Sequence, residues 1–135
     1  MFVVHVVVGL ATVAVTFAQS SRSVWDGVYT KEQATRGALS SGLCTQCHGD
    51  SFQGDPAPPL TGPDFLGKWD GRTVGDLFEL IRQTMPDDDP GALTREQYAD
   101  LLAYIFNLNK FPAGTTELAD EAEPLKQIRF QAARP

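Results

Sequence analysis

The sequence predicts an all-α domain, because three segments carry helix-start signals and two of them continue with apolar residues at helical spacing. In each signal a threonine stands three residues before a side chain able to close the first turn: Thr30 with Gln33, Thr73 with Asp76, Thr94 with Gln97. Of the 135 residues, 42% are hydrophobic, which is enough for the core of a single domain. We therefore expect one helical domain at 30–110.

The first helix is expected to run from Lys31 to about Leu43. Its small residues Ala34, Gly37 and Ala38 recur at helical spacing, so another helix can cross this face closely. Residues 20–28 before it form a linker or an arm, and we assign 19–29 to a linker preceding the domain.

The segment 49–68 is predicted to be an irregular loop. It is rich in glycine, proline and aspartate, and its four prolines do not suit a helix interior: Pro56, Pro58, Pro59 and Pro63.

The second and third helices carry apolar stripes. After Thr73, an apolar stripe extends to Thr84, and Met85-Pro86 ends it. A tight polar loop follows at 87–91. The third helix is expected at 95–108, with apolar side chains at helical period: Tyr98, Leu101, Leu102, Ile105 and Leu108.

The two ends of the chain are expected to differ from the domain. Residues 1–18 form an apolar export signal ending in small residues, with cleavage before Gln19, although the first basic residue is only Arg22. The alternatives are an uncleaved anchor or a buried strand. The C-terminal extension at 111–135 holds scattered apolar residues (Leu118, Leu125, Ile128 and Phe130) and either wraps back over the body or is disordered.

One motif carries the chemistry: Cys44-Thr45-Gln46-Cys47-His48. The spacing C-x-x-C-H is the attachment pattern of c-type haem, because one helical turn presents both sulfurs to the ring edge and the next residue to the iron. Cys44 and Cys47 are the only cysteines of the chain. The motif predicts one covalent haem c, with its iron bound by His48.

Met85 is the candidate for the second axial ligand. If residues 1–18 are removed, the mature chain keeps one histidine, His48, and one methionine, Met85, and His/Met ligation needs one of each. The alternative for a lone methionine is core filling.

The formal net charge is −6, and the chain has no basic run, so we expect no nucleic-acid partner. An acidic surface favours partner proteins with a basic docking face. Asp87, Asp88 and Asp89 directly follow the candidate ligand Met85. They are either an ordinary solvated run or a cluster that stabilises ferric iron, lowers the reduction potential and selects a basic partner.

With these motifs, residues 29–110 resemble a class I cytochrome c. The flanking stretches 24–29 and 111–114 look like those of small bacterial cytochromes associated with quinoprotein dehydrogenases. The resemblance implies the cytochrome c fold, in which the helices 31–43 and 95–108 cross around a haem crevice and Gly37 faces Tyr104 or a neighbour. The chain departs from the family after Gly37, where an aromatic residue is absent and the run to Cys44 is one residue short.

The resemblance also implies roles for residues outside the motif. The run 58–62 matches the family's P-x-L-x-G pattern, so the carbonyl of Pro58 would accept a hydrogen bond from His48 Nδ1. Trp69 would pack on the haem and donate its indole N–H to a propionate, and Arg72 would pair with the same carboxylate. The alternatives are an ordinary proline-rich turn, a core aromatic and a solvated surface charge.

These predictions favour an exported, periplasmic electron carrier that is not itself an enzyme. Its partners would be a dehydrogenase as donor and an oxidase or another cytochrome as acceptor; membrane contact would occur only through an uncleaved N-terminus. Two alternatives remain open: a cytochrome subunit of a quinoprotein dehydrogenase complex, and a peroxidase-like haem enzyme with a vacant axial position. A thioredoxin-like pair or a zinc site is disfavoured, because the motif lies among helical signals and only three N/S ligands are present.

Overall fold

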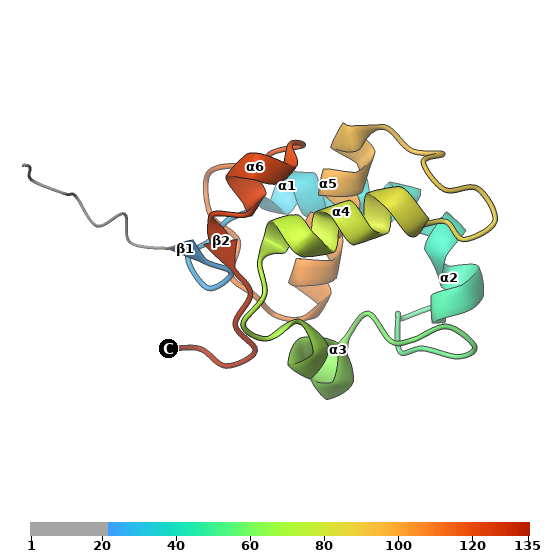
Figure 1. Ribbon diagram of the computed structural model, residues 1–135, viewed down its shortest axis with the longest axis horizontal. Coiled ribbons are helices and arrows are strands. Elements are labelled where there is room, and N and C mark those ends of the chain that lie inside the picture. The colour runs from blue at the N-terminus through green and yellow to red at the C-terminus, as the bar shows by residue number, and fades with distance from the viewer. Residues whose placement is uncertain (1–21) are drawn as a thin grey trace, which may run out of the picture.

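Two crossing helices, α1 (Lys31–Ser40) and α5 (Arg95–Leu108), organise the computed structural model, which describes residues 22–135 (Figure 1). The predicted export signal or anchor at 1–18 lies outside the described residues. The helices touch at Gly37, where an added Cβ would collide with the carbonyl oxygen of Asp100 and lie 2.9 Å from Cβ of Tyr104. The predicted close crossing at Gly37 is therefore confirmed.

The first helix ends earlier than predicted. It stops at Ser40 rather than near Leu43, and α2 (Gly42–His48) begins after Ser41. The backbone N–H and the hydroxyl of Ser41 both donate to the carbonyl of Ala38, at 3.3 and 2.7 Å. These local bonds tighten the turn and separate two helices where one was expected, because serine competes for backbone acceptors.

The prediction of an irregular loop over 49–68 is wrong for its last third. The helix α3 (Gly62–Trp69) occupies that part, with Pro63 in its first turn, where a missing N–H costs nothing. Phe65 and Trp69, four residues apart, are both buried. Proline at this position starts a helix, and the i, i+4 aromatic pair was the signal for it.

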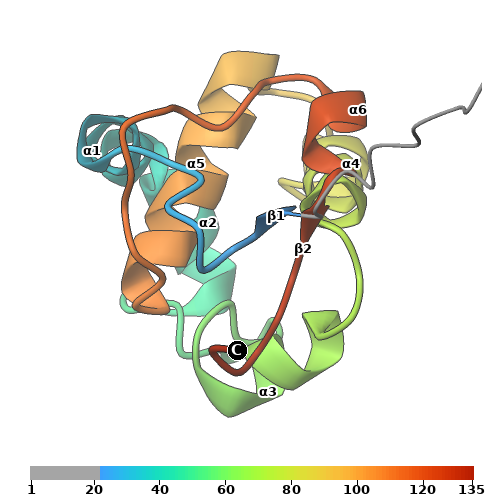
Figure 2. The ribbon, with the colours of Figure 1, turned by 90° about the vertical axis from the view of Figure 1, so that its left-hand side faces the viewer.

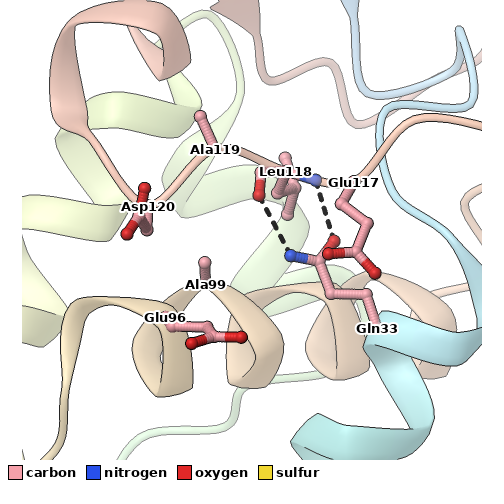
Figure 3. Close-up of a pocket in the computed structure, with 7 residues that line it drawn as sticks. All are labelled: Gln33, Glu96, Ala99, Glu117, Leu118, Ala119 and Asp120. Atoms are coloured by element: carbon pink, nitrogen blue, oxygen red, sulfur yellow. Dashed lines mark hydrogen bonds between the residues drawn. The ribbon is translucent and has the colours of Figure 1, made fainter.

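The remaining long helix, α4 (Val74–Thr84), and α5 begin at complete capping boxes formed by Thr73 with Asp76 and by Thr94 with Gln97. At α1 only half of the box forms. Thr30 Oγ1 accepts the N–H of Gln33 at 3.1 Å, but the side chain of Gln33 points to the backbone of Leu118 instead (Figure 3).

Residues 111–135, which we call the C-terminal strap, wrap over the body. The strap passes over α1 and α5, forms α6 (Ala122–Leu125), and ends beside α4 and α3 (Figures 1 and 2). Its four predicted apolar anchors are all buried: Leu118, Leu125, Ile128 and Phe130. The strand β2 (Ile128–Arg129) pairs in parallel with β1 (Arg22–Ser23), the only strands described within 22–135. Because Val24 and Val28 are also buried, residues 22–28 form a packed arm.

Aromatic side chains from α3, α5 and the strap itself build the core beneath the strap. Phe130 packs edge-to-face against Phe65, Phe106 and Phe111, with ring centroids 5.5–6.0 Å apart. Within residues 22–135, no helix has the length and apolar character needed to cross a bilayer.

Candidate functional site

The helix α2 carries the three residues of the predicted haem motif. Cys44 and Cys47 are one turn apart, so their free thiols lie along the same side of the helix. Cys44 is half-buried against the core and burial raises the pKa of its thiol, whereas Cys47 is exposed. His48 is buried, with 8% of its surface exposed. The motif thus combines an exposed thiol at Cys47 with a buried imidazole at His48.

The loop that follows folds back onto this helix. Gly49 ends α2 with a φ of +83°, a conformation that favours glycine. The N–H of Gly54 then donates to the carbonyl of His48 at 2.8 Å, and the N–H of Ala57 donates to that of Cys47 at 2.9 Å. These bonds fix the next residue, Pro58, beside the histidine.

His48 Nδ1 lies 2.6 Å from the carbonyl oxygen of Pro58, so the contact implied by the P-x-L-x-G pattern is present. A carbonyl oxygen can only accept a hydrogen bond, and Nδ1 therefore carries the proton. The lone pair is left on Nε2, the nitrogen that would face a metal. Two thiols and an imidazole in this tautomer fit the attachment and proximal ligation of haem.

Sequence reasoning missed Asn109, which anchors this loop to the end of α5. Its Oδ1 accepts the N–H of Gly62 at 3.0 Å, and its Nδ2 donates to the carbonyls of Leu60 and Ile105, both at 2.9 Å. An asparagine at a helix end is a recognisable cap residue, but its partners 49 and 47 residues away could not be inferred from local pattern.

Met85 stands at the end of α4 in extended conformation and is half-buried. Its carbonyl accepts a hydrogen bond from the hydroxyl of Tyr98 on α5 at 2.6 Å, and the same hydroxyl accepts the N–H of Gly91 at 3.1 Å. Tyr98 therefore closes the loop 85–91. Sequence reasoning placed Tyr98 in an apolar stripe and did not find this second contact.

Trp69 and Arg72 are brought together. The guanidinium of Arg72 lies 4.3 Å from the centre of the Trp69 ring, within cation–π distance. Trp69 is buried in the described residues, with 2% of its surface exposed. The strap fixes the backbone around Arg72, because Phe130 N–H donates to the carbonyl of Arg72 and the carbonyl of Phe130 accepts the N–H of Gly71, both at 2.9 Å.

Asp87, Asp88 and Asp89 are all exposed in the predicted polar loop. A separate hollow of about 250 Å³ lies between α1, α5 and the strap, and it contains none of the predicted site residues (Figure 3). Within 22–135, no three His, Cys, Asp or Glu side chains converge as a metal cluster would require.

Residues 32–105, more than half of the chain, match the model of a protein family described as cytochrome c oxidase, cbb3-type, subunit III. The chain belongs to this family. It therefore contains a c-type cytochrome domain, and the predicted all-α cytochrome c fold is confirmed. Comparison with curated proteins gives no match, and comparison with solved structures gives none either.

Membership of the family agrees with the geometry of α2. A cytochrome c domain binds haem and serves haem-based electron transfer. The side chains of this chain fit that group: two thiols lie on one helix face, the imidazole of His48 is hydrogen-bonded through Nδ1 to Pro58, and an arginine stacks on a tryptophan.

Proposed function

We propose that this protein is a one-electron carrier with one haem c, held by thioether bonds to Cys44 and Cys47 and ligated by His48 and Met85. The single observation that carries the proposal is the hydrogen bond between His48 Nδ1 and the Pro58 carbonyl. This bond fixes the tautomer and orientation that an axial imidazole needs. When bound, the haem supplies the one-electron couple.

The chain's own residues then define what kind of chemistry the site serves. Cys44 and Cys47 would hold the group along α2, and Pro58 holds the His48 ring. Met85 offers an uncharged, soft thioether, which favours the ferrous state and raises the potential. With His48 and Met85 both bound to the iron, no coordination site would be left for a substrate.

Trp69 and Arg72 would face the propionates. Arg72 is exposed and stacks on the indole ring, so its guanidinium can turn to a carboxylate without leaving its support. The indole N–H of Trp69 would donate to the same carboxylate. Both residues would then neutralise charge on the haem.

For partners and location, we propose an exported protein that exchanges electrons with periplasmic redox proteins. A dehydrogenase would be the donor, and an oxidase or another cytochrome the acceptor. A basic docking face suits a chain of net charge −6. Membrane attachment would require an uncleaved N-terminal segment.

Absorption spectra of the exported protein, oxidised and reduced, with and without carbon monoxide, test the proposal. We expect a pigment that acid-acetone does not extract, a far-red methionine–iron band in the oxidised form, and no reaction of the reduced form with carbon monoxide. Ready binding of carbon monoxide would instead support the peroxidase-like alternative. Co-purification with a larger dehydrogenase would support the subunit alternative.

Variants test the proposed roles of Met85 and of the two cysteines separately. Met85→Ala should abolish the far-red band and lower the potential while the haem stays attached, whereas Cys44→Ser with Cys47→Ser should remove covalent attachment. Gln83→Ala, an exposed position two residues before Met85, is the control and should change neither property. An unchanged far-red band in Met85→Ala would exclude Met85 as the ligand.

A further inference from the structure

The hydroxyl of Tyr98 connects both ends of the loop 85–91 to helix α5. It donates to the carbonyl of Met85 at 2.6 Å and accepts the N–H of Gly91 at 3.1 Å. A phenolic hydroxyl has one hydrogen to donate and lone pairs that accept. Both capacities are therefore used by backbone groups of a single loop, the one that begins with the proposed distal ligand.

The rest of this loop has little else to hold it. Within the part of the chain that the structure describes, the other hydrogen bonds of residues 86–91 are local, from the N–H of Asp89 to the carbonyl of Pro86 and from the N–H of Ala92 to that of Asp89. Residues 87–92 are exposed, and the connection from α4 to α5 arches outside the helices (Figure 1). A segment with few buried contacts opens at low cost in free energy. The hydroxyl of Tyr98 therefore supplies the hydrogen bonds that tie this loop to α5.

Tyr98 is itself held in place by the core. Its side chain is 1% exposed, and its N–H donates to the carbonyl of Thr94 at 3.0 Å in the first turn of α5. The same helix packs against α1 at Gly37. A buried ring on a closely packed helix has few alternative positions. The hydroxyl is thus a fixed point to which the loop is attached.

Met85 is held from two helices through its backbone. Its N–H donates to the carbonyl of Ile81 on α4 at 2.8 Å, and its carbonyl is bound by Tyr98 on α5. These two bonds fix the backbone on both sides of the Cα atom. A thioether is a soft ligand without charge, and a ligand held close to its bound position loses less conformational entropy when it binds.

We propose that Tyr98 is a positioning residue for Met85, and that its hydroxyl keeps the thioether on the iron against competing small ligands. The inference rests on the proposed function, because it takes Met85 as the distal ligand. Tyr98 acts through the backbone of Met85 and is not a ligand itself. When Met85 leaves the iron and the loop opens, the bonds of the hydroxyl to the loop are lost, so these bonds favour the closed, methionine-bound form.

The test adds imidazole to the haem-loaded, oxidised protein and follows the loss of the far-red methionine–iron band. Tyr98→Phe keeps the buried ring and removes only the hydroxyl. We expect its dissociation constant for imidazole to be about five- to tenfold lower than that of the unsubstituted protein, because the methionine-bound form has lost its hydrogen bonds to α5.

Tyr29→Phe is the matched control. Tyr29 is also 1% exposed, and its hydroxyl donates to the carbonyl of Phe111 at 2.7 Å, so the variant loses the same kind of buried bond beneath the strap. It should lower the stability of the fold to a similar extent and leave imidazole affinity unchanged. A role of Tyr98 in general stability alone predicts equal effects in the two variants.

Hydrogen exchange gives a second measurement that does not depend on methionine ligation. In the unsubstituted protein the amide of Gly91 should exchange slowly although the residue is exposed, and Tyr98→Phe should speed its exchange about tenfold or more while Tyr29→Phe does not.

Three outcomes overturn the inference: imidazole binding that Tyr98→Phe leaves unchanged, including no binding to either protein; an equal gain of affinity in Tyr29→Phe; and an unprotected amide of Gly91 in the unsubstituted protein. Failure of the proposed function is visible separately, as the absence of the far-red band before any imidazole is added.

Discussion

The face beneath the C-terminal strap and the face around α2 differ in how far their apolar side chains are buried. Under the strap, Phe106 and Phe130 are fully buried and pack edge-to-face with their aromatic neighbours. Around α2, Leu39 is 85% exposed and Cys47 is exposed. The chain completes its own packing on the first face and leaves apolar groups accessible on the second. The haem proposed on α2 would cover part of the second face.

The two faces also differ in their charges. On the strap side, Arg36 donates to Asp100 and Glu117, both at 2.9 Å, and so ties α1 to α5 and to the strap. The hydrogen bond from Arg36 lowers the pKa of Glu117. On the other face, the three aspartates of the loop 87–89 are exposed side by side. Charges are paired on the strap side and left in solvent in the loop 87–89.

The largest effect on stability is expected when one aromatic residue under the strap is replaced. Phe130→Ala should lower the free energy of unfolding by about 3–5 kcal/mol, because a fully buried ring is lost and a cavity remains. Leu39→Ala should change it by less than about 0.5 kcal/mol, since that side chain is exposed. Urea unfolding followed by circular dichroism measures both, and equal costs would contradict the contrast.

The next largest loss of stability is expected at the crossing of α1 and α5. Gly37→Ala should destabilise the protein by about 2–3 kcal/mol, because the new Cβ meets backbone atoms of Asp100 that cannot move aside. Gly67→Ala is the matched control on α3, where nothing lies within 4 Å of the added atom. It should be neutral or stabilise by up to about 1 kcal/mol. The same unfolding measurement distinguishes the two variants.

The capping boxes of α4 and α5 should differ in how their contribution to stability depends on pH. Hydrogen bonds from Thr73 lower the pKa of Asp76 in the folded protein. Its stabilisation is therefore present above the ordinary pKa of 3.8 and is lost as the pH falls through the lowered value. Asp76→Ala should cost about 0.5–1 kcal/mol at pH 7 and less at pH 3.

Gln97 is the uncharged counterpart at the start of α5, where it completes the capping box with Thr94. Gln97→Ala should cost a similar amount, and that cost should be the same at pH 7 and at pH 3, because its amide does not titrate. Urea unfolding at the two pH values measures both variants. If the loss of stability in Gln97→Ala depended on pH, or that in Asp76→Ala did not, ionisation of Asp76 would not be the cause of the difference.

The smallest effect concerns the loop after Met85. Replacing Asp87, Asp88 and Asp89 by asparagine should raise the midpoint potential by on the order of 10–50 mV at low salt, because negative charge favours ferric iron. The rise should shrink in high salt. Redox titration measures it, with Asp70→Asn, an exposed aspartate in the turn after α3, as a control that removes a single negative charge away from this loop. A potential that stays constant in the triple variant would mean that these carboxylates are only solvated.

The sequence alone determined the parts of this protein that depend on local chemistry. C-x-x-C-H at 44–48 specifies thiols and imidazole on one turn, and threonines followed three residues later by Asp76 and Gln97 specify where α4 and α5 start. The small residues Ala34, Gly37 and Ala38 indicated a helix face that another helix can approach closely, and the family resemblance indicated Gly37 as the contact. Each of these signals acts within about one helical turn.

Only the tertiary structure decided which distant groups meet. The side chain of Gln33 bonds to the backbone of Leu118 instead of completing its own capping box. Asn109 binds the loop at Leu60 and Gly62, and the hydroxyl of Tyr98 donates to the carbonyl of Met85. Each polar group has several partners available in an unfolded chain, and packing of the whole domain selects one. The helix α3 was missed for a related reason: four nearby prolines indicate a loop, until burial of Phe65 and Trp69 favours the helix.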